Sequence, residues 1–397
     1  MFHFMTTSKI VFGEGALQSS LSILNQFGYS VLLVTGKDRS RAHTIIEYLK
    51  SQSIRYQHIS VTSEPTIAMV EESAIVARRF KPDVVVAMGG GSVIDMGKAL
   101  AAMTTNFGDL YDYVEVVGRN VPIKSPPLPM IAIPTTASTG AEATKNAVIK
   151  SGQDRVKVSL RHPQMLPDVA IVDPTLTYGT DVQTSGRGAM DAFTHLMEAY
   201  VCGEPNPLTD MICEEGLRRI ARSVVPACVY DNPRARSDLS FAALLGGMAI
   251  SNAKLGAAHG LASALGGKIP APHGVITARL APFVMAANSK MALHCGRTDL
   301  LTRYKKVSEL ITGDPSAQIE EGIAWVSHTI EQLHIPSLSR YGLSHLSFAE
   351  IAQDALQSVA MKGNSLPLSQ DVLMEILSQV GSGHQQQEKR DDLSEMV

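Results

Sequence analysis

Four side chains of the metal-binding type stand in the second half of the sequence. Asp191 and His195 are four residues apart in a stretch that the pattern predicts to be helical, so both would lie on one helical face, one turn apart. His259 follows, and His273 comes fourteen residues later, between a proline and a glycine. One carboxylate and three imidazoles suit Zn²⁺ or Fe²⁺ better than Ca²⁺ or Mg²⁺. A site with open positions would let such an ion polarise an alkoxide or carbonyl oxygen.

Each of these residues also has an ordinary structural interpretation. An aspartate and a histidine at this spacing could form a simple pair within one helix. A histidine after a proline is often a loop residue. The spacing by itself therefore leaves the metal site and the structural interpretation both open.

A glycine-rich segment in the first half could bind phosphate. The apolar run 84–88 is expected to be a strand, and Asp95 and Lys98 follow on an expected helix. Glycines allow a sharp turn and a close approach of the backbone to a ligand, and the start of the helix offers N–H groups to a pyrophosphate. The spacing is neither G-x-G-x-x-G nor that of a Walker loop, so a tight turn without a ligand is the alternative. The residues of this turn are Gly89, Gly90, Gly91 and Ser92.

A second polar loop follows the next apolar run, 130–133. Its hydroxyl groups could hydrogen-bond a nucleotide, although a loop rich in threonine and serine is usually only a solvated turn. Its expected position at the same edge of the sheet as the glycine turn supports a role in nucleotide binding. Its candidate binding residues are Thr135, Thr136 and Ser138.

The first half of the chain alternates short apolar runs with amphipathic stretches. The stretches 66–79 and 92–102 have a helical pattern. Strands that alternate with helices predict a parallel, doubly wound α/β sheet, in which ligands bind beyond the carboxyl ends of the strands. We expect this dinucleotide-binding domain to span residues 1–180. Its expected strands are residues 10–12, 31–34, 54–61, 84–88, 130–133 and 169–172.

The second half has apolar residues at helical spacing and lacks convincing strand patterns. It predicts an all-α, metal-binding domain over residues 181–380. The tail, 381–397, has three glutamines and mixed charges and is expected to be disordered. The expected helices include residues 211–224, 237–250, 310–333 and 348–359.

Composition makes a small molecule the expected partner. The net charge is −3, with 45% hydrophobic and 18% charged residues, so no basic excess indicates nucleic acid or an anionic membrane. Four cysteines without a close CxxC pair favour reduced thiols in a cytoplasmic protein. The first eight residues have no apolar core of a secretory signal, and no stretch reaches the roughly 18 apolar residues of a membrane span.

These motifs, taken in order, resemble the iron-containing (group III) alcohol dehydrogenases, a family that includes lactaldehyde reductase and 1,3-propanediol dehydrogenase. The resemblance begins at residues 9–16 and continues to about residue 288. Its specific pieces are the segments 89–98, 134–144, 166–173, 191–200 and 259–274.

The resemblance implies a Rossmann-like N-terminal domain and a helical C-terminal domain, an architecture shared with dehydroquinate synthase. It implies that Asp191, His195, His259 and His273 bind one divalent metal, Fe²⁺ first and Zn²⁺ second. It further implies a homodimer or larger homo-oligomer. By matching position, the cofactor-binding residues are Gly90, Gly91 and Ser92 at the pyrophosphate, Asp95 toward the nicotinamide, and Thr135, Thr136 and Lys157 on the nucleotide.

Three departures from the family pattern matter. The family has a second histidine four residues after the third ligand, and here that position is Ser263, which we consider as a proton relay. Gly36 stands where relatives that prefer NAD carry an aspartate, and Lys37 follows it with Arg39 and Arg41 nearby. This favours NADP(H), with Asp38 as the counter-argument. The family's usual asparagine before Pro-Thr is replaced by Glu64, which puts one cofactor contact in doubt.

The sequence therefore predicts a metal-dependent, NAD(P)-linked alcohol dehydrogenase or aldehyde reductase, with reversible hydride transfer between a small alcohol and the nicotinamide. Two alternatives within the enzymes are a maleylacetate reductase-like protein, which works without this metal set, and a dehydroquinate synthase-like lyase. A third is a non-catalytic nucleotide-binding protein. Net reduction of the nicotinamide by an excess of alcohol separates the dehydrogenase from the last two.

Overall fold

The computed structural model describes residues 1–154 and 156–382. These residues form two compact units. The first comprises Met1–Thr180 and Asp231–Asn252, and the second comprises Asp181–Tyr230 and the chain from Ala253 onward. The expected disordered tail lies largely outside the described residues. Its first two positions, 381 and 382, still belong to the last helix.

The first unit is built on a parallel sheet of six strands, in the order β1-β8-β5-β4-β2-β3. Its central strands are continuous apolar runs that are buried on both faces, as parallel sheets between helical layers require. The predicted parallel α/β fold is confirmed. The strands are β1 (Lys9–Phe12), β2 (Ser30–Gly36), β3 (Arg55–Val61), β4 (Val84–Gly89), β5 (Met130–Pro134) and β8 (Val169–Val172).

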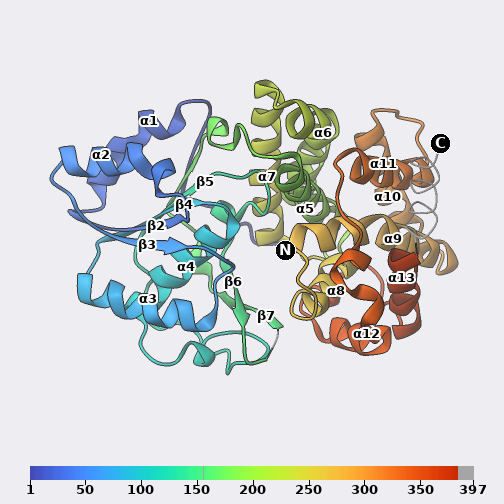
Figure 1. The fold of residues 1–397 in the computed structure, drawn as a ribbon. Helices are drawn as coiled ribbons and strands as arrows, with labels where there is room; N and C mark the ends of the chain where they lie inside the picture. Colours follow the sequence, from blue (N-terminus) through green and yellow to red (C-terminus); the bar gives the residue numbers. More distant parts are fainter. Residues whose placement is uncertain (155, 383–397) are drawn as a thin grey trace, which may run out of the picture. The chain divides into compact units, whose positions relative to one another are not determined.

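Helices cover both faces of this sheet (Figure 1). Helices α1 (Ala16–Ser20) and α2 (His43–Ser51) pack on one face, where Val31 and Leu33 belong to their core cluster. Helices α3 (Ile67–Phe80) and α4 (Gly91–Thr105) pack on the other. Gly97 permits close packing of α4, since a Cβ there would lie 2.6 Å from that of Ala87 in β4.

Two features of the first unit were not predicted. Strands β6 (Asn146–Ser151) and β7 (Val156–Arg161) form an antiparallel hairpin of their own. Helix α7 (Pro233–Asn252) also belongs to this unit, so a single division after residue 180 is wrong. Two glycines allow α7 to pack closely in the first unit, because a Cβ on Gly247 would lie only 2.0 Å from the carbonyl oxygen of Gly140. The hydroxyl of Ser251 also donates to the carbonyl of Ala143 at 2.8 Å.

In the described part of the second unit the regular elements are helices, as predicted. The expected helix 310–333 is two helices, because Gly313 adopts a left-handed φ of 74° and ends the first of them. The helices are α5 (Val182–Val201), α6 (Pro207–Tyr230), α8 (Ala257–Leu265), α9 (His273–His294), α10 (Thr298–Thr312), α11 (Ile319–Gln332), α12 (Phe348–Gln357) and α13 (Gln370–Ser382).

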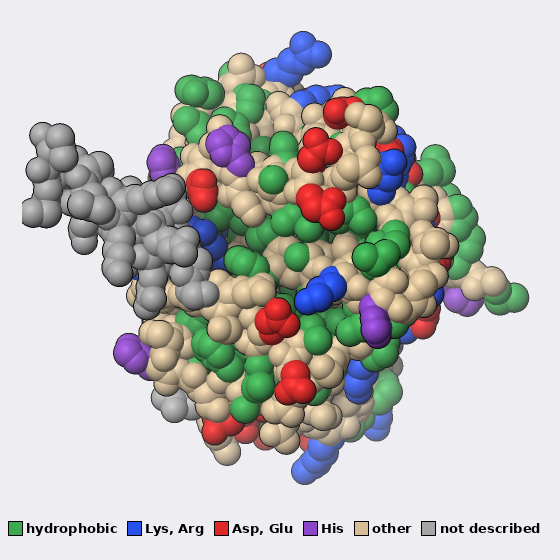
Figure 2. Space-filling model, turned by 90° about the vertical axis from the view of Figure 1, so that its right-hand side faces the viewer, with side chains coloured by type: hydrophobic (Ala, Val, Ile, Leu, Met, Phe, Trp, Pro, Cys, Tyr) green, Lys and Arg blue, Asp and Glu red, His purple; other side chains and the backbone are tan. Residues whose placement is uncertain are grey.

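The described surface shows no concentration of one charge on the face drawn in Figure 2. Lysine and arginine side chains are scattered there among aspartate and glutamate. Within residues 1–154 and 156–382, no single helix is long and apolar enough to cross a membrane. The consecutive helices α7 and α8 meet that test only when taken together.

Candidate functional site

Asp191 and His195 lie on α5, as their spacing predicts. The helix begins after Asp181, whose carboxylate accepts a hydrogen bond from the backbone N–H of Thr184 at 2.9 Å. Asp191 is 1% exposed and His195 is 4% exposed. A buried carboxylate must have partners that offset its desolvation, so these two residues indicate a built polar site.

The other two predicted ligands come from separate helices of the same unit. His259 lies near the start of α8, and His273 is the first residue of α9. The Oδ1 atom of Asp191 lies 3.9 Å from Nε2 of His259 and 3.8 Å from Nε2 of His273. The rings of His195 and His259 are stacked, with centroids 4.6 Å apart. Three helices thus bring the four residues together.

The four residues are not equivalent. Asp191, His195 and His259 each offer a ligand atom within 4.8 Å of the others and are all buried. His273 stands at the edge of this group, with 31% of its side chain exposed. Its ring is tilted against that of His259, at a centroid distance of 5.6 Å.

Electrostatics favours a negative Asp191 beside a neutral His195. Burial raises the pKa of Asp191, but the charges of His195, His273 and His259 and the hydroxyl of Thr277 outweigh burial and lower it. Burial lowers the pKa of His195 to about 4, so its ring is neutral at pH 7, as a metal ligand must be. Burial also disfavours charge on His259, but the hydrogen bond and charge of Glu198 raise the pKa of that ring.

Two buried nitrogen atoms of this group test whether a cation fits. Nε2 of His259 and Nδ1 of His195 have no hydrogen-bond partner, although buried polar atoms are rarely left without one. An imidazole nitrogen with a free lone pair beside a carboxylate is a donor for a transition metal. The residues present therefore fit a divalent ion of the Fe²⁺ or Zn²⁺ type.

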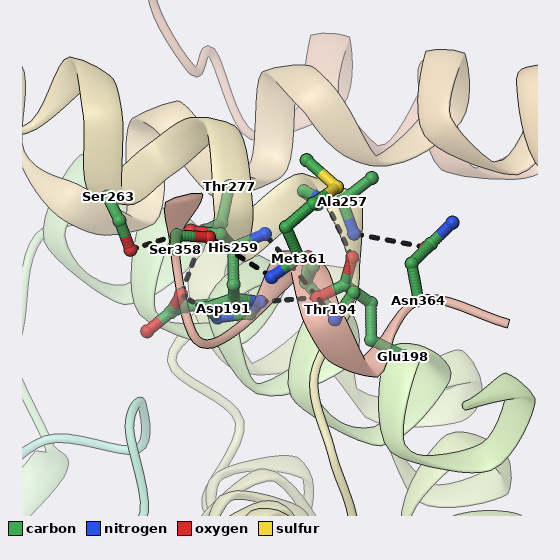
Figure 3. Close-up of polar contacts among 12 residues, drawn as sticks. Asp191, Thr194, Glu198, Ala257, His259, Ser263, Thr277, Ser358, Met361 and Asn364 are labelled. Carbon is green, nitrogen blue, oxygen red and sulfur yellow. Dashed lines mark hydrogen bonds and ion pairs between the residues drawn. The ribbon is translucent and has the colours of Figure 1, made fainter. Parts of the chain in front are cut away.

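Two supporting residues were missed by the sequence analysis (Figure 3). Oε2 of Glu198 lies at hydrogen-bond distance from Nδ1 of His259, 2.7 Å, and the hydroxyl of Thr277 donates to Oδ1 of Asp191 at 2.8 Å. Each stands at helical spacing from a predicted ligand: Glu198 seven residues after Asp191 on α5, and Thr277 four residues after His273 on α9. That spacing is the signal that could have found them.

The predicted dinucleotide-binding residues gather at the carboxyl edge of the parallel sheet in the first unit. Gly89 ends β4 and pairs in register with Pro134, the last residue of β5, and the N–H of Thr135 donates to the carbonyl of Gly89 at 3.0 Å. A Cβ on Gly91 would lie 2.9 Å from Oγ1 of Thr139, so the two loops touch. The structure therefore brings together Gly89, Gly90, Gly91, Ser92, Thr135, Thr136 and Ser138.

The remaining predicted cofactor residues also lie in the first unit, where two of them form ion pairs. Gly36 is the last residue of β2, the neighbour of β4 in the sheet, and Lys37 follows it. Asp95 forms an ion pair with the buried Lys98 at 3.1 Å. Lys157, on β7, forms an ion pair with Glu64 at 2.5 Å.

These two units define the class of protein: a sheet with a glycine turn that suits a dinucleotide, and a helical unit whose buried cluster suits a divalent metal, as in metal-dependent dehydrogenases. Comparisons with known proteins give the family. The model described as iron-containing alcohol dehydrogenase matches residues 7–174, and the model of the C-terminal part of that family matches residues 186–381.

Individual relatives agree with the family models. The chain is 31% identical to 1,3-propanediol dehydrogenase of Klebsiella pneumoniae, over 90% of this chain and 93% of the relative. It is 29% identical to NADPH-dependent butanol dehydrogenase of Clostridium saccharobutylicum, over 96% and 99%. The solved structure of a 1,3-propanediol oxidoreductase aligns with a TM-score of 0.87 and 29% identity, over 96% of this chain and all of that one.

The chain belongs to the iron-containing alcohol dehydrogenase family. The predicted family, fold class and enzyme class are confirmed: this is a metal-dependent alcohol dehydrogenase of a family that uses NAD(P)(H) and iron.

Proposed function

We propose that this enzyme catalyses reversible hydride transfer between a small alcohol and NADP(H), with Asp191, His195, His259 and His273 holding one Fe²⁺. The observation that carries the proposal is the convergence of a buried carboxylate with imidazoles from two other helices. The unpartnered nitrogens of His195 and His259 support metal binding. Zn²⁺ is the second candidate, since its preferred ligands are of the same types.

The chemistry divides between the bound groups and the protein. When bound, the cation acts as a Lewis acid on an alcohol or carbonyl oxygen, and the dinucleotide supplies the hydride chemistry. The chain's own residues position them. The turn 89–92 presents the start of α4 to a pyrophosphate, and Asp191 contributes the negative charge that attracts the cation. His273, the most exposed of the four ligands, leaves the group open on its side.

Ser263 is proposed as a proton relay. It stands one turn after His259 on α8, is half-buried, and donates its hydroxyl proton to the carbonyl of His259 at 2.8 Å. The hydroxyl oxygen keeps its lone pairs, so it can accept a proton from the substrate side once its own proton turns from this carbonyl to water. Ser263→Ala should lower kcat and change its solvent isotope effect without changing the metal content. An unchanged isotope effect would remove Ser263 from the proton path.

The preference for NADP(H) over NAD(H) is supported by the loop after β2. Asp38 is engaged locally: its Oδ1 accepts from the N–H of Ser40 at 3.0 Å and from its hydroxyl at 2.6 Å. Arg39 lies against Tyr56, donating to its hydroxyl at 2.9 Å, so its guanidinium lies beside an aromatic ring. An arginine so placed suits a 2′-phosphate. Arg39→Ala should raise KM for NADPH by about 10-fold or more and leave KM for NADH unchanged.

The test of the function is a panel of small alcohols and aldehydes with NAD(H) and NADP(H), paired with elemental analysis of protein purified without chelator. Asp191→Ala and His273→Ala should lose metal and turnover while the circular dichroism spectrum and the melting transition remain. Turnover that persists in metal-free protein would overturn the metal role. Binding of NADPH without turnover of any alcohol or aldehyde would favour a nucleotide-binding protein.

A cytoplasmic location and a homodimeric or larger assembly complete the proposal. Cys202, Cys213 and the exposed Cys295 are thiols that form no disulfide, which suits a reducing compartment. Light scattering coupled to size-exclusion chromatography tests the assembly, and a monomer at micromolar concentration would overturn it.

A further inference from the structure

Glu198 is a buried carboxylate on the face of α5 that carries Asp191 and His195. It is 2% exposed, and positions 191, 195 and 198 follow the helical repeat of three and four residues. Its partners lie on α8, some sixty residues away in sequence. Oε2 lies 2.7 Å from Nδ1 of His259, and Oε1 accepts from the backbone N–H of Ala258 at 2.7 Å.

The start of α8 depends on side chains from elsewhere in the second unit, because its N-cap residue is Gly256 and no side chain of the cap makes a hydrogen bond. Glu198 accepts from the N–H of Gly256 at 2.9 Å and of His259 at 3.4 Å, besides that of Ala258. Asn364 accepts from the N–H of Ala257 at 3.1 Å. These are the amides that a helix cannot satisfy internally. Figure 3 shows Glu198 and Asn364 reaching this end of the helix.

The same carboxylate fixes the ring of His259. Glu198 lies among N–H donors, so its oxygens act as acceptors and the Nδ1 atom of His259 must donate to it. The other ring nitrogen, Nε2, is then free to offer its lone pair. It is buried, has no hydrogen-bond partner, and lies 3.9 Å from Oδ1 of Asp191.

We propose that Glu198 is a positioning residue for the metal: it sets the tautomer and orientation of His259 and ties α8 to the helix that carries two other ligands. This inference rests on the proposed metal site. A carboxylate behind a metal-bound histidine typically changes metal affinity or activity by about 10–100-fold when it is removed. Here one residue also supplies the cap of the helix that carries the histidine.

Glu198→Gln is the informative change, because it keeps the size of the side chain but replaces one acceptor oxygen with an NH₂ donor. That donor stands either in the place of Oε1, which accepts from Ala258, or in the place of Oε2, which contacts Nδ1 of His259 and accepts from the N–H groups of Gly256 and His259. Facing Nδ1, it forces that atom to accept, and the proton moves to Nε2, where it blocks metal binding. We expect affinity for Zn²⁺ to fall by about 10–100-fold.

Asn364→Ala is the matched control. It removes a second cap of α8, at Ala257, and no hydrogen bond of its side chain reaches His259. If Glu198 served only to cap the helix, the two variants would behave alike. We expect Asn364→Ala to lower the melting temperature while its affinity for Zn²⁺ stays within about threefold of wild type, well short of the loss at a supporting carboxylate.

The experiment uses the full chain, stripped of metal and titrated with Zn²⁺ against a fluorescent chelator. Nitrogen-15 NMR of labelled histidines in the metal-free protein, above the pKa of imidazole, reports the tautomer of His259, whose signals are identified by their loss in His259→Gln. The expected result is weaker Zn²⁺ binding and a proton moved from Nδ1 to Nε2 in Glu198→Gln alone. An unchanged tautomer with unchanged affinity would overturn the positioning role.

The two proposals fail in different ways. If wild type and Asp191→Ala bind Zn²⁺ equally poorly, the metal site is wrong, while a tautomer shift in Glu198→Gln still supports the contact with His259. Should Glu198→Gln not fold, Gly256→Ala is the second variant, because its added Cβ would lie 2.9 Å from Oε1 of Glu198. The same Cβ would lie 2.8 Å from Oδ1 of Asn364, and Asn364→Ala controls for that contact. Wild-type tautomer and affinity in that variant would overturn the inference.

Discussion

Gly274 sets how closely α9 approaches α5 beside the candidate ligands. A Cβ on it would lie 2.4 Å from the carbonyl oxygen of Arg187 and 3.4 Å from Cβ of Asp191. Real Cβ atoms essentially never make contacts under 3.0 Å, and a backbone oxygen cannot rotate out of the way. Gly274→Ala should therefore push the two helices apart by about 0.6 Å, the difference between 2.4 and 3.0 Å.

This displacement is large compared with the tolerance of a metal site. Nε2 of His273 lies 3.8 Å from Oδ1 of Asp191, and two ligands of one ion with bonds of about 2.1 Å are at most about 4.2 Å apart. A further 0.6 Å along that line takes the pair to about 4.4 Å. His273 and Asp191 could then no longer share one ion. We expect metal affinity to fall beyond the roughly 10–100-fold that loss of a supporting contact causes.

Titration of the metal-free, full-length protein with Zn²⁺ against a competing chelator measures this effect, and thermal melting followed by circular dichroism reports the fold. Gly186→Ala is the matched control on α5. Its Cβ would lie 3.0 Å from the side chain of Leu333, away from the ligands, so its affinity should stay at the wild-type value. A folded Gly274→Ala protein that binds Zn²⁺ like wild type would refute the reasoning.

Three further changes test the polar groups of both units. Burial raises the pKa of Glu142 from 4.5 to about 7, so its contribution to stability is present below pH 4.5 and lost as the pH rises through 7. The free energy of unfolding of Glu142→Gln, measured with urea, should exceed that of wild type by up to about 3 kcal/mol between pH 4.5 and 8. A lower value than wild type at pH 8 would contradict this. Lys98→Met leaves Asp95 without its cation and should lower the free energy of unfolding by about 3–5 kcal/mol, measured in the same way. Thr277→Val should weaken Zn²⁺ binding about 10-fold without lowering the melting temperature by more than a few degrees.

The parallel sheet was predictable because its central strands are short, continuous apolar runs, which fit a buried strand. The run Val31–Val34 is fully buried, and a continuous apolar run of this length between turn signals fits a strand covered on both faces. The hairpin of β6 and β7 escaped because Asn146–Ser151 mixes polar residues into a half-buried strand. Its register depends on pairing with β7, a contact that local pattern does not encode.

The break between α10 and α11 was not predicted for a different physical reason. Apolar residues continue at helical spacing through 310–333, and the period alone predicts one helix. Gly313 and Pro315 lie inside that range, and a glycine with φ of 74° ends a helix in the way such residues usually do. The glycine and proline outweigh the apolar periodicity there, since a proline removes a backbone donor that the next helical turn needs.

Helix α5 carries information about the candidate site beyond its two predicted ligands. From Ala189 to Val201 the helix is buried on all sides, so any polar side chain in it needs a partner that offsets its desolvation. The polar side chains Asp191, Thr194, His195 and Glu198 fall at helical spacing on one stripe. Thr194 satisfies itself by donating to the carbonyl of Met190 at 2.7 Å. The other three cannot do so, and a buried stripe of one imidazole between two carboxylates predicts partners from other elements. Which elements supply them depends on how α8 and α9 fold back, and that is fixed by contacts such as Gly274 against Arg187 that no local pattern contains.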